Sequence, residues 1–276
     1  MNMRCILQPK PLAMMWRLLP LLALLLPTSF VRAEELTIAV ASNFTAPMRE
    51  IAARFEAQSD HRVALVFGSS GKIFAQISHG APYQAFFSAD QSKPARLVEL
   101  GLANGDSRFT YAEGKLALWS RQPDYVDDQG KVLKQGKFNR LALANPKLAP
   151  YGAAALEVLQ NLQLAEQNRS RWVFGENIAQ TYQFVASGNA ELGFVALSQI
   201  LRDGRVSQGS AWVVPEELYN PIRQDAVILK SAEKQSVLRE FWRFIQGPEA
   251  RKIIESYGYG IVAQLPEKSS QSGDAE

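Results

Sequence analysis

The sequence is poor in the residues that most catalytic and metal sites use. Its 276 residues include one cysteine, Cys5, and two histidines, His61 and His79. One cysteine cannot form a disulfide within the chain, and neither histidine has a second ligand at helical or zinc-site spacing. A Ser-His-acid triad would need one of these histidines, and no Gly-x-Ser-x-Gly elbow is present. The sequence therefore argues against thiol, zinc and serine-hydrolase chemistry, and we expect both histidines at the surface.

A complete nucleotide-binding phosphate loop is also missing. Residues 68–72 read GSSGK, but a Walker loop needs glycine at position 66, where this chain has Val66. It also needs serine or threonine after the lysine, where this chain has Ile73. We therefore do not expect a nucleotide-hydrolysing site.

Long hydrophobic runs are absent except near the N-terminus. Residues 18–26 read LLPLLALLL, which is short for a membrane span. Basic residues precede this run, and Val31-Arg32-Ala33 provides the small residues that a signal peptidase reads. We therefore predict a signal peptide at 1–33 and a soluble, periplasmic protein. Because Cys5 precedes the apolar run, we expect no lipid on it; a membrane-anchor helix is the alternative for this segment.

Charge gives no reason to expect a nucleic-acid partner. The predicted signal peptide contains four of the 30 basic residues and none of the 27 acidic ones, so the remaining chain is close to neutral. The basic isoelectric point of 8.9 belongs to the whole chain. A polar tail from residue 267 is expected to be flexible.

Apolar runs of strand length alternate with helical patterns along the rest of the chain. This alternation predicts mostly parallel sheets covered by helices on both faces, in one large domain or two small ones. The predicted strands are 36–41, 62–67, 85–88, 116–119, 141–144, 192–196, 211–214 and 226–229. Helices are predicted from Thr45, Ser69–Gly71 and Ser92, over 152–162 and 177–186, and as a pair before Tyr257.

Two strand-to-helix turns are rich in small polar groups. Ala41-Ser42-Asn43-Phe44-Thr45 follows the first strand, and Gly68-Ser69-Ser70-Gly71 follows the second. Helix N-termini carry unpaired N–H groups and partial positive charge, and in open α/β sheets ligands bind at the carboxyl ends of the strands. Together the turns predict an anion site, although each serine alone fits an ordinary N-cap as well.

The two turns and four later stretches resemble the periplasmic molybdate-binding proteins of ABC importers. The first two motifs are the more specific, and the likeness covers nearly all of the chain after residue 33. The stretches are AVASNFTAPMREIAARFE, VFGSSGKIFAQISHGAP, FFSADQSKPARLVELGL, ANPKLAPYGAAALEVL, ENIAQTYQFVASGNAELGFVALSQI and FWRFIQGPEARKIIESYGY.

The resemblance implies an α/β, two-lobed periplasmic binding protein fold of type II, with the ligand cleft between the lobes. It places lobe 1 at 34–112 plus 222–266 and lobe 2 at 113–221. It further implies a monomer that closes on its ligand and delivers it to an ABC importer permease with a cytoplasmic ATPase. No catalysis, cofactor or metal is implied; the ligand is molybdate or tungstate.

The resemblance also implies which residues bind the ligand: Ser42, Asn43, Ser70, Tyr151 and Ile178. Ser42 and Ser70 supply hydroxyls, and Tyr151 and Ile178 supply backbone donors. A doubly charged tetrahedral anion needs many donors and few acceptors, which neutral groups at helix ends provide. Lys72 is expected to be solvated rather than bound to the anion.

Two positions depart from the family pattern. Many members have a ligand-facing tyrosine where this chain has Ala196, and we expect Asn43 or Tyr151 to supply the missing donor. Gln84 replaces an aspartate that many members have. Three alternatives to a molybdate carrier stay open: a protein that binds another tetrahedral oxyanion, such as sulfate or phosphate, an enzyme acting on a phosphate ester, and an interaction domain without a ligand.

Overall fold

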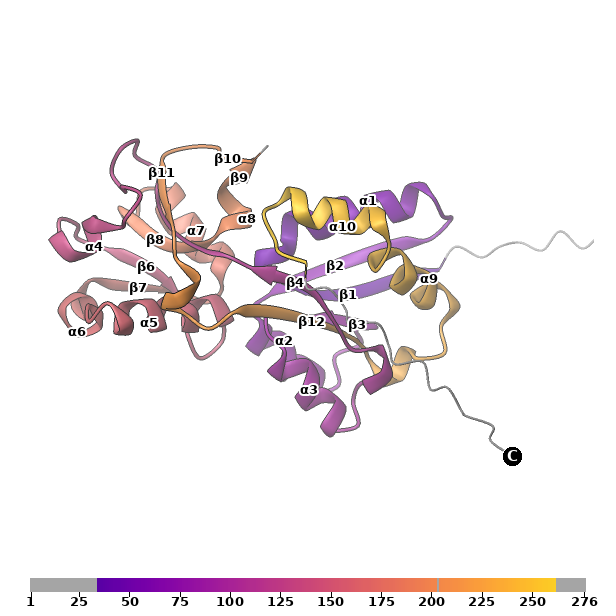
Figure 1. The fold of residues 1–276 in the computed structure, drawn as a ribbon. Helices are drawn as coiled ribbons and strands as arrows, with labels where there is room; N and C mark the ends of the chain where they lie inside the picture. The colour runs from indigo at the N-terminus through magenta and orange to yellow at the C-terminus, as the bar shows by residue number, and fades with distance from the viewer. Residues whose placement is uncertain (1–33, 203, 262–276) are drawn as a thin grey trace, which may run out of the picture. The chain divides into compact units, whose positions relative to one another are not determined.

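The computed structural model describes residues 34–202 and 204–261. The predicted signal peptide and the polar tail from residue 267 lie outside these residues. Within them, no helix combines the length and apolarity that crossing a membrane requires. The chain forms two five-stranded sheets, each with its own helices (Figure 1).

The first sheet has the strand order β2-β1-β3-β12-β4. β1, β2 and β3 pair in parallel, whereas β12 is antiparallel to both β3 and β4. Four of the five strands therefore run in one direction, as expected for a mostly parallel sheet. The strands are β1 (Glu35–Ala41), β2 (Arg62–Gly68), β3 (Ala85–Phe87), β4 (Phe109–Gly114) and β12 (Ile222–Ile228).

Helices cover both faces of the first sheet (Figure 1). In β1, Ile38 and Val40 point to the core under α1, α9 and α10, whereas Ala39 faces the core under α2 and α3. This alternation is the period of two that places successive side chains on opposite faces. The helices are α1 (Thr45–Ala57), α2 (Ser70–Ser78), α3 (Ser92–Glu99), α9 (Ser236–Ile245) and α10 (Pro248–Ser256). The sheet and these helices form what we call the first lobe.

The second sheet has the order β11-β5-β8-β6-β7. β8, β6 and β7 pair in parallel, and β5 is antiparallel to its neighbours β8 and β11. Again a single strand is reversed. The strands are β5 (Leu116–Ser120), β6 (Leu141–Ala144), β7 (Trp172–Gly175), β8 (Leu192–Ala196) and β11 (Ser210–Val213).

Two further cores lie on the two faces of the second sheet. Leu118 and Phe194 pack with α4 and α5 on one face, and Trp119 and Val195 pack with α7 and α8 on the other. The helices are α4 (Lys131–Gln135), α5 (Pro150–Asn161), α6 (Ala165–Asn168), α7 (Ile178–Ala186) and α8 (Leu197–Ile200). We call this sheet with its helices the second lobe.

Most predicted elements are present, with corrections at helix starts. The serine that caps α2 is Ser69, whose hydroxyl accepts from the N–H of Lys72 at 3.4 Å. At α3, Ser92 is already helical, and Asp90 accepts from the N–H of Lys93 at 3.1 Å. Thr45 is likewise the first helical residue of α1 rather than its N-cap, and its hydroxyl donates to the carbonyl of Ser42. Short polar side chains compete for such sites, and tertiary contacts decide between neighbours.

Strands β4 and β7 were not predicted. β4 reads FTYAEG, whose polar residues and glycine hide the strand pattern, and β7 has only four residues. β12 begins at Ile222, four residues before its predicted start at Ala226. Both β4 and β12 depend on pairing with each other, which local sequence does not reveal.

Candidate functional site

The five residues predicted to bind the ligand are all buried where helices begin. Ser42 and Asn43 open the 3-10 turn η1 (Ser42–Phe44) ahead of α1, and Ser70 is the first residue of α2. Tyr151 is the second residue of α5, and Ile178 is the first of α7. None of the five is more than 6% exposed.

Contacts between the lobes bring these helix starts together. The N–H of Gly71 donates to the carbonyl of Leu148 at 2.8 Å, which joins the start of α2 to the loop before α5. Helix α7 packs against η1. Ala41, Tyr151 and Ile178 belong to one buried cluster, although they come from both lobes. Four helix N-termini therefore meet at the boundary between the lobes.

Two hydroxyls from the first lobe keep their hydrogens available. The Ser70 oxygen accepts from the N–H of Ala89 at 2.9 Å, and its hydrogen has no acceptor among the described residues. The Ser42 hydroxyl makes no hydrogen bond to any residue that the structure describes. Each hydroxyl therefore has a hydrogen that it can donate to a ligand.

The second lobe contributes backbone donors. Over residues 34–202 and 204–261, neither the N–H of Tyr151 nor that of Ile178 has an acceptor, as expected for the first turn of a helix. Gly152 lets the chain at α5 lie tightly on β6: a Cβ there would be 2.1 Å from the carbonyl oxygen of Ala144. The backbone of this helix start is therefore held in place by close packing.

The side chain of Asn43 differs from the expected role. Its amide nitrogen donates to the Gln224 side chain at 2.8 Å and to the Tyr259 hydroxyl at 3.0 Å. Both amide hydrogens are thereby used, so this side chain does not replace the donor missing at Ala196. The Tyr151 phenol accepts a long hydrogen bond, 3.3 Å, from the Gln224 amide.

These contacts belong to a buried polar network that sequence analysis missed. Tyr111 donates to Gln224 at 3.0 Å and to the carbonyl of Ser88 at 2.9 Å. Burial raises the pKa values of Tyr111 and Tyr151 well above the usual 10, and that of Tyr259 to about 12. The phenols are therefore neutral hydrogen-bonding groups. Their residues are scattered along the chain, and only the glycines on each side of Tyr259 hint at a special position.

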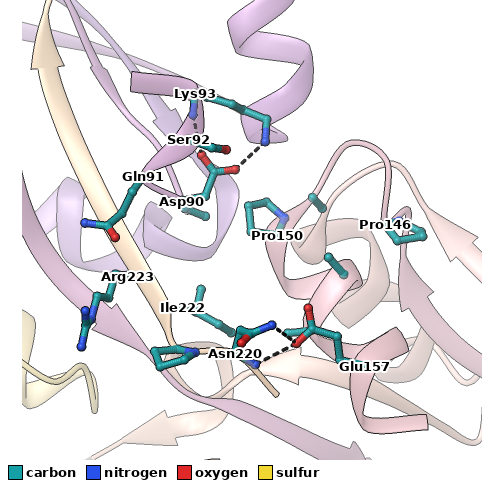
Figure 2. Close-up of a pocket in the computed structure, with 15 residues that line it drawn as sticks. Asp90, Gln91, Ser92, Lys93, Pro146, Pro150, Glu157, Asn220, Ile222 and Arg223 are labelled. Carbon is teal, nitrogen blue, oxygen red and sulfur yellow. Dashed lines mark hydrogen bonds and ion pairs between the residues drawn. The ribbon is translucent and has the colours of Figure 1, made fainter. Parts of the chain in front are cut away.

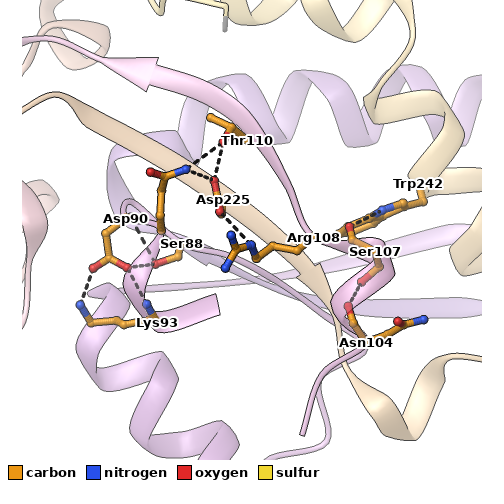
Figure 3. A network of polar contacts seen from close by, with 10 residues as sticks. Ser88, Asp90, Lys93, Asn104, Ser107, Arg108, Thr110, Asp225 and Trp242 are labelled. Atoms are coloured by element: carbon orange, nitrogen blue, oxygen red, sulfur yellow. Dashed lines mark hydrogen bonds and ion pairs between the residues drawn. The ribbon is translucent and has the colours of Figure 1, made fainter. Parts of the chain in front are cut away.

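Strand β12 carries Gln224 into this network beside a buried acid. Asp225 is held by Thr110 at 2.6 Å and by Arg108 at 3.3 Å (Figure 3). A bulge between Gln224 and Asp225 shifts the register with β4. The paired charge anchors the strand, so the position of Gln224 is well defined.

Lys72 and Gln84 each contact a residue of the protein itself. Lys72 forms an ion pair with Glu176 at 2.9 Å, and both side chains are about half exposed. Gln84 accepts a hydrogen bond from the N–H of Thr37 and so supports the first sheet. His79 is exposed, as expected, whereas His61 is partly covered, 3.6 Å from Glu240.

A separate cavity of 320 Å³ lies beside α3 and α5 (Figure 2). None of the five predicted residues lines it. Its acids already have partners: Lys93 pairs with Asp90, and Asn220 donates to Glu157 from its backbone at 2.7 Å and from its side chain at 3.2 Å. The charges that line this cavity balance, because Asp90 and Glu157 are matched by Lys93 and Arg223, and Arg223 also pairs with Glu113 at 3.3 Å.

Comparison with known proteins identifies the family. Residues 36–260 match the model for bacterial extracellular solute-binding proteins. The molybdate-binding protein ModA of Azotobacter vinelandii is 52% identical over 230 residues, which cover 83% of this chain and 91% of that protein. ModA of Rhodobacter capsulatus is 48% identical, over 82% of this chain and 88% of that protein.

Solved structures agree with these relatives. The periplasmic molybdate-binding protein of Azotobacter vinelandii superposes with a TM-score of 0.80 at 42% identity, covering 82% of this chain and 99% of that one. The likeness extends over both lobes, so the two-lobed type II fold expected from the sequence is confirmed. With helices on both faces of two mixed sheets and its helix starts gathered at the lobe boundary, the chain belongs to the bacterial extracellular solute-binding proteins.

Proposed function

We propose that this protein captures molybdate in the periplasm and delivers it unchanged to the permease of an ABC importer. The observation that carries the proposal is the set of unpaired donors at the lobe boundary: the hydroxyls of Ser42 and Ser70 and the N–H groups of Tyr151 and Ile178. The 52% identity to a molybdate-binding protein supports the choice of oxyanion.

The donor set suits a dianion. Each hydrogen bond to a charged group contributes about 1.5–3 kcal/mol, so four or more support tight binding after ordering costs. The partial positive charge of several helix N-termini adds attraction without arginine or lysine. Tungstate has the same shape and charge, and we propose that it binds as well.

We assign the contacts by residue. Ser42 and Ser70 donate through their hydroxyls, and Tyr151 and Ile178 through their backbone. Asn43, whose amide hydrogens are already donated, serves through its backbone N–H. We keep the predicted lobe bounds of 34–112 with 222–266, and 113–221, except that β4 extends the first lobe to Gly114. The lobes close on the ion by a hinge motion through the segments that join them.

Export and assembly complete the proposal. We propose that residues 1–33 are removed as a signal peptide, that the product carries no lipid, and that it acts as a monomer. Intact mass spectrometry of the exported protein tests all three when combined with light scattering. A retained leader, an added acyl mass or a stable dimer would each contradict the corresponding part.

Calorimetric titration against four anions tests the ligand. We expect molybdate and tungstate to bind and sulfate and phosphate to bind much more weakly at equal concentration. Because the ion binds the folded state, molybdate should also raise the melting temperature. Equal stabilisation by sulfate or phosphate would show that the ligand assignment is wrong.

A further inference from the structure

We infer that Tyr259 is a positioning residue of the anion site, whose hydroxyl clasps the first lobe to the second. The hydroxyl lies 2.8 Å from the carbonyl oxygen of Asn43, beside Ser42, and 3.0 Å from the hydroxyl of Ser198 in α8. Ser198 also donates to the Asn43 carbonyl at 3.1 Å. The inference rests on the proposed function, because the clasp acts on the same cleft.

Each hydrogen of this cluster has an acceptor within it. Tyr259 donates its hydrogen to the Asn43 carbonyl and accepts from the Asn43 amide at 3.0 Å. Ser198 then donates either to the Tyr259 oxygen or to the same carbonyl. All three residues are buried, with no more than 5% of their surface exposed. Asn43 is therefore held from two sides, by its carbonyl and by its amide.

The segment that carries Tyr259 is built into the boundary between the lobes. Gly260 exchanges two backbone hydrogen bonds of 2.8 Å with Glu113, which anchors the segment to the first lobe. Gly258 has φ +82°, and a Cβ there would be 2.7 Å from the Leu201 side chain after α8. The ring of Tyr259 packs edge-on against Phe44, with centroids 5.3 Å apart. Backbone and ring together fix where the hydroxyl lies.

A second layer holds the amide of Asn43 in the right orientation. Its acceptor, the Gln224 side chain, also receives the Tyr111 hydroxyl at 3.0 Å. The Gln224 nitrogen in turn donates to Tyr151, from the second lobe. The turn at Ser42 and Asn43 is thus braced by groups from both lobes.

Closure links this clasp to affinity. A ligand that binds the closed form has an apparent Kd equal to its intrinsic Kd divided by the closed fraction. Losing a hydrogen bond that joins the two lobes lowers that fraction and speeds release. Tyr259 does this without touching the ion, so its removal should act on the dissociation rate and on the ligand-free lobe opening.

The variants to compare are Tyr259→Phe and Tyr257→Phe. The Tyr257 hydroxyl donates to Glu50 at 3.0 Å, within the first lobe, so its removal is a matched control from the same segment. We expect Tyr259→Phe to weaken molybdate binding about tenfold, mainly through faster dissociation, as for the loss of a buried hydrogen bond. Tyr257→Phe should leave both quantities within about twofold of the parent.

A second variant and a ligand-free measurement complete the test. Ser198→Ala removes the partner on the other lobe. Because Ser198 still donates to the Asn43 carbonyl when Tyr259 is replaced by Phe, the double variant should weaken binding more than Tyr259→Phe alone. Small-angle scattering without ligand should show a larger radius of gyration for Tyr259→Phe than for Tyr257→Phe. Unchanged dissociation and radius, or a loss confined to melting temperature, would overturn the clasp. If the parent binds none of the four anions, the proposed function fails, and the scattering result alone decides the clasp.

Discussion

The two lobes contribute to the proposed site in different ways. The first lobe presents side-chain hydroxyls, on Ser42 and Ser70, whereas the second presents backbone N–H groups at Tyr151 and Ile178. Both kinds of donor lie at helix N-termini, so the dipoles act alike. They differ in how a mutation can remove them. The donors of the first lobe, which we call the first half of the site, are lost when the residue type changes. The donors of the second lobe, the second half, are lost only when the backbone changes.

This difference fits the large side chains that the second lobe places at its two donor positions. Tyr151 and Ile178 are buried at 1% and 2% exposure, and their side chains pack in the core while their N–H groups are unpaired. The position of these N–H groups depends on the residues packed around the helix starts, above all on Gly152, where a side chain would collide with β6. In the proposed site, by contrast, the donors of the first lobe are the hydroxyls themselves.

Removing both hydroxyls gives the largest expected effect. In Ser42→Ala with Ser70→Ala, two hydrogen bonds to the anion are lost, and affinity should fall by about 3–6 kcal/mol if the effects add. Calorimetry measures the loss. Ser69→Ala is the control, since Ser69 caps α2 at 3.4 Å; it should cost at most about 1 kcal/mol of stability. Normal affinity in the double variant would remove the first half from the site.

High pH tests the phenol network that braces the first half. Burial raises the pKa of Tyr259 to about 12 from 10, so the folded state favours the neutral phenol. Its contribution is fully present below pH 10 and is lost between about pH 10 and 12, by roughly 3 kcal/mol. Urea unfolding across this range should show a smaller fall for Tyr259→Phe than for the parent. Equal slopes would show that Tyr259 does not titrate in the way proposed.

Proline at position 178 tests the backbone half. Ile178 is the first residue of α7, where proline is favoured, and Asn177 before it is extended, with φ −145° and ψ 174°. Ile178→Pro therefore deletes one N–H and leaves the helix start in place, and affinity should fall by about 1.5–3 kcal/mol. Ile178→Val keeps the N–H and should bind normally. Similar affinity for both would mean that this N–H does not contact the ion.

A methyl group between the lobes should have a smaller effect. In Gly71→Ala the new Cβ would lie 3.0 Å from the backbone of Leu148, so it opposes closure while each lobe stays intact. We expect about 1 kcal/mol loss of affinity and an unchanged melting temperature without ligand. A fall in melting temperature with unchanged affinity would place the strain inside the first lobe instead.

The exposed ion pair across the lobes should matter least. Lys72→Ala removes the ion pair with Glu176. Both side chains are about half exposed, and such exposed pairs contribute about 0–1 kcal/mol to stability. Affinity should change by less than about threefold, and only at low salt. A large loss would instead indicate that Lys72 approaches the anion. Glu176→Gln breaks the same pair and is the matched control.

Much of the fold was predictable because its patterns are local. Strands β6 and β8 match their predicted ranges, and α1, α5 and α7 begin within two residues of prediction. In these elements the apolar spacing and the turn residues agree. β4 and β7 were missed since a short or polar strand is specified by its neighbours in the sheet rather than by its own residues.

Residue types alone indicate the kind of chemistry at the boundary between the lobes. Small hydroxyl residues at strand ends, with few histidines and one cysteine, predict anion binding by neutral donors. Which of the donors remain free depends on how the chain folds in three dimensions. Ser42 and Asn43 are adjacent and both polar, yet the hydroxyl is unpaired and the amide is fully used by Gln224 and Tyr259. Those partners lie more than 180 residues away in the chain, and a hydrogen bond depends on where its acceptor lies in space.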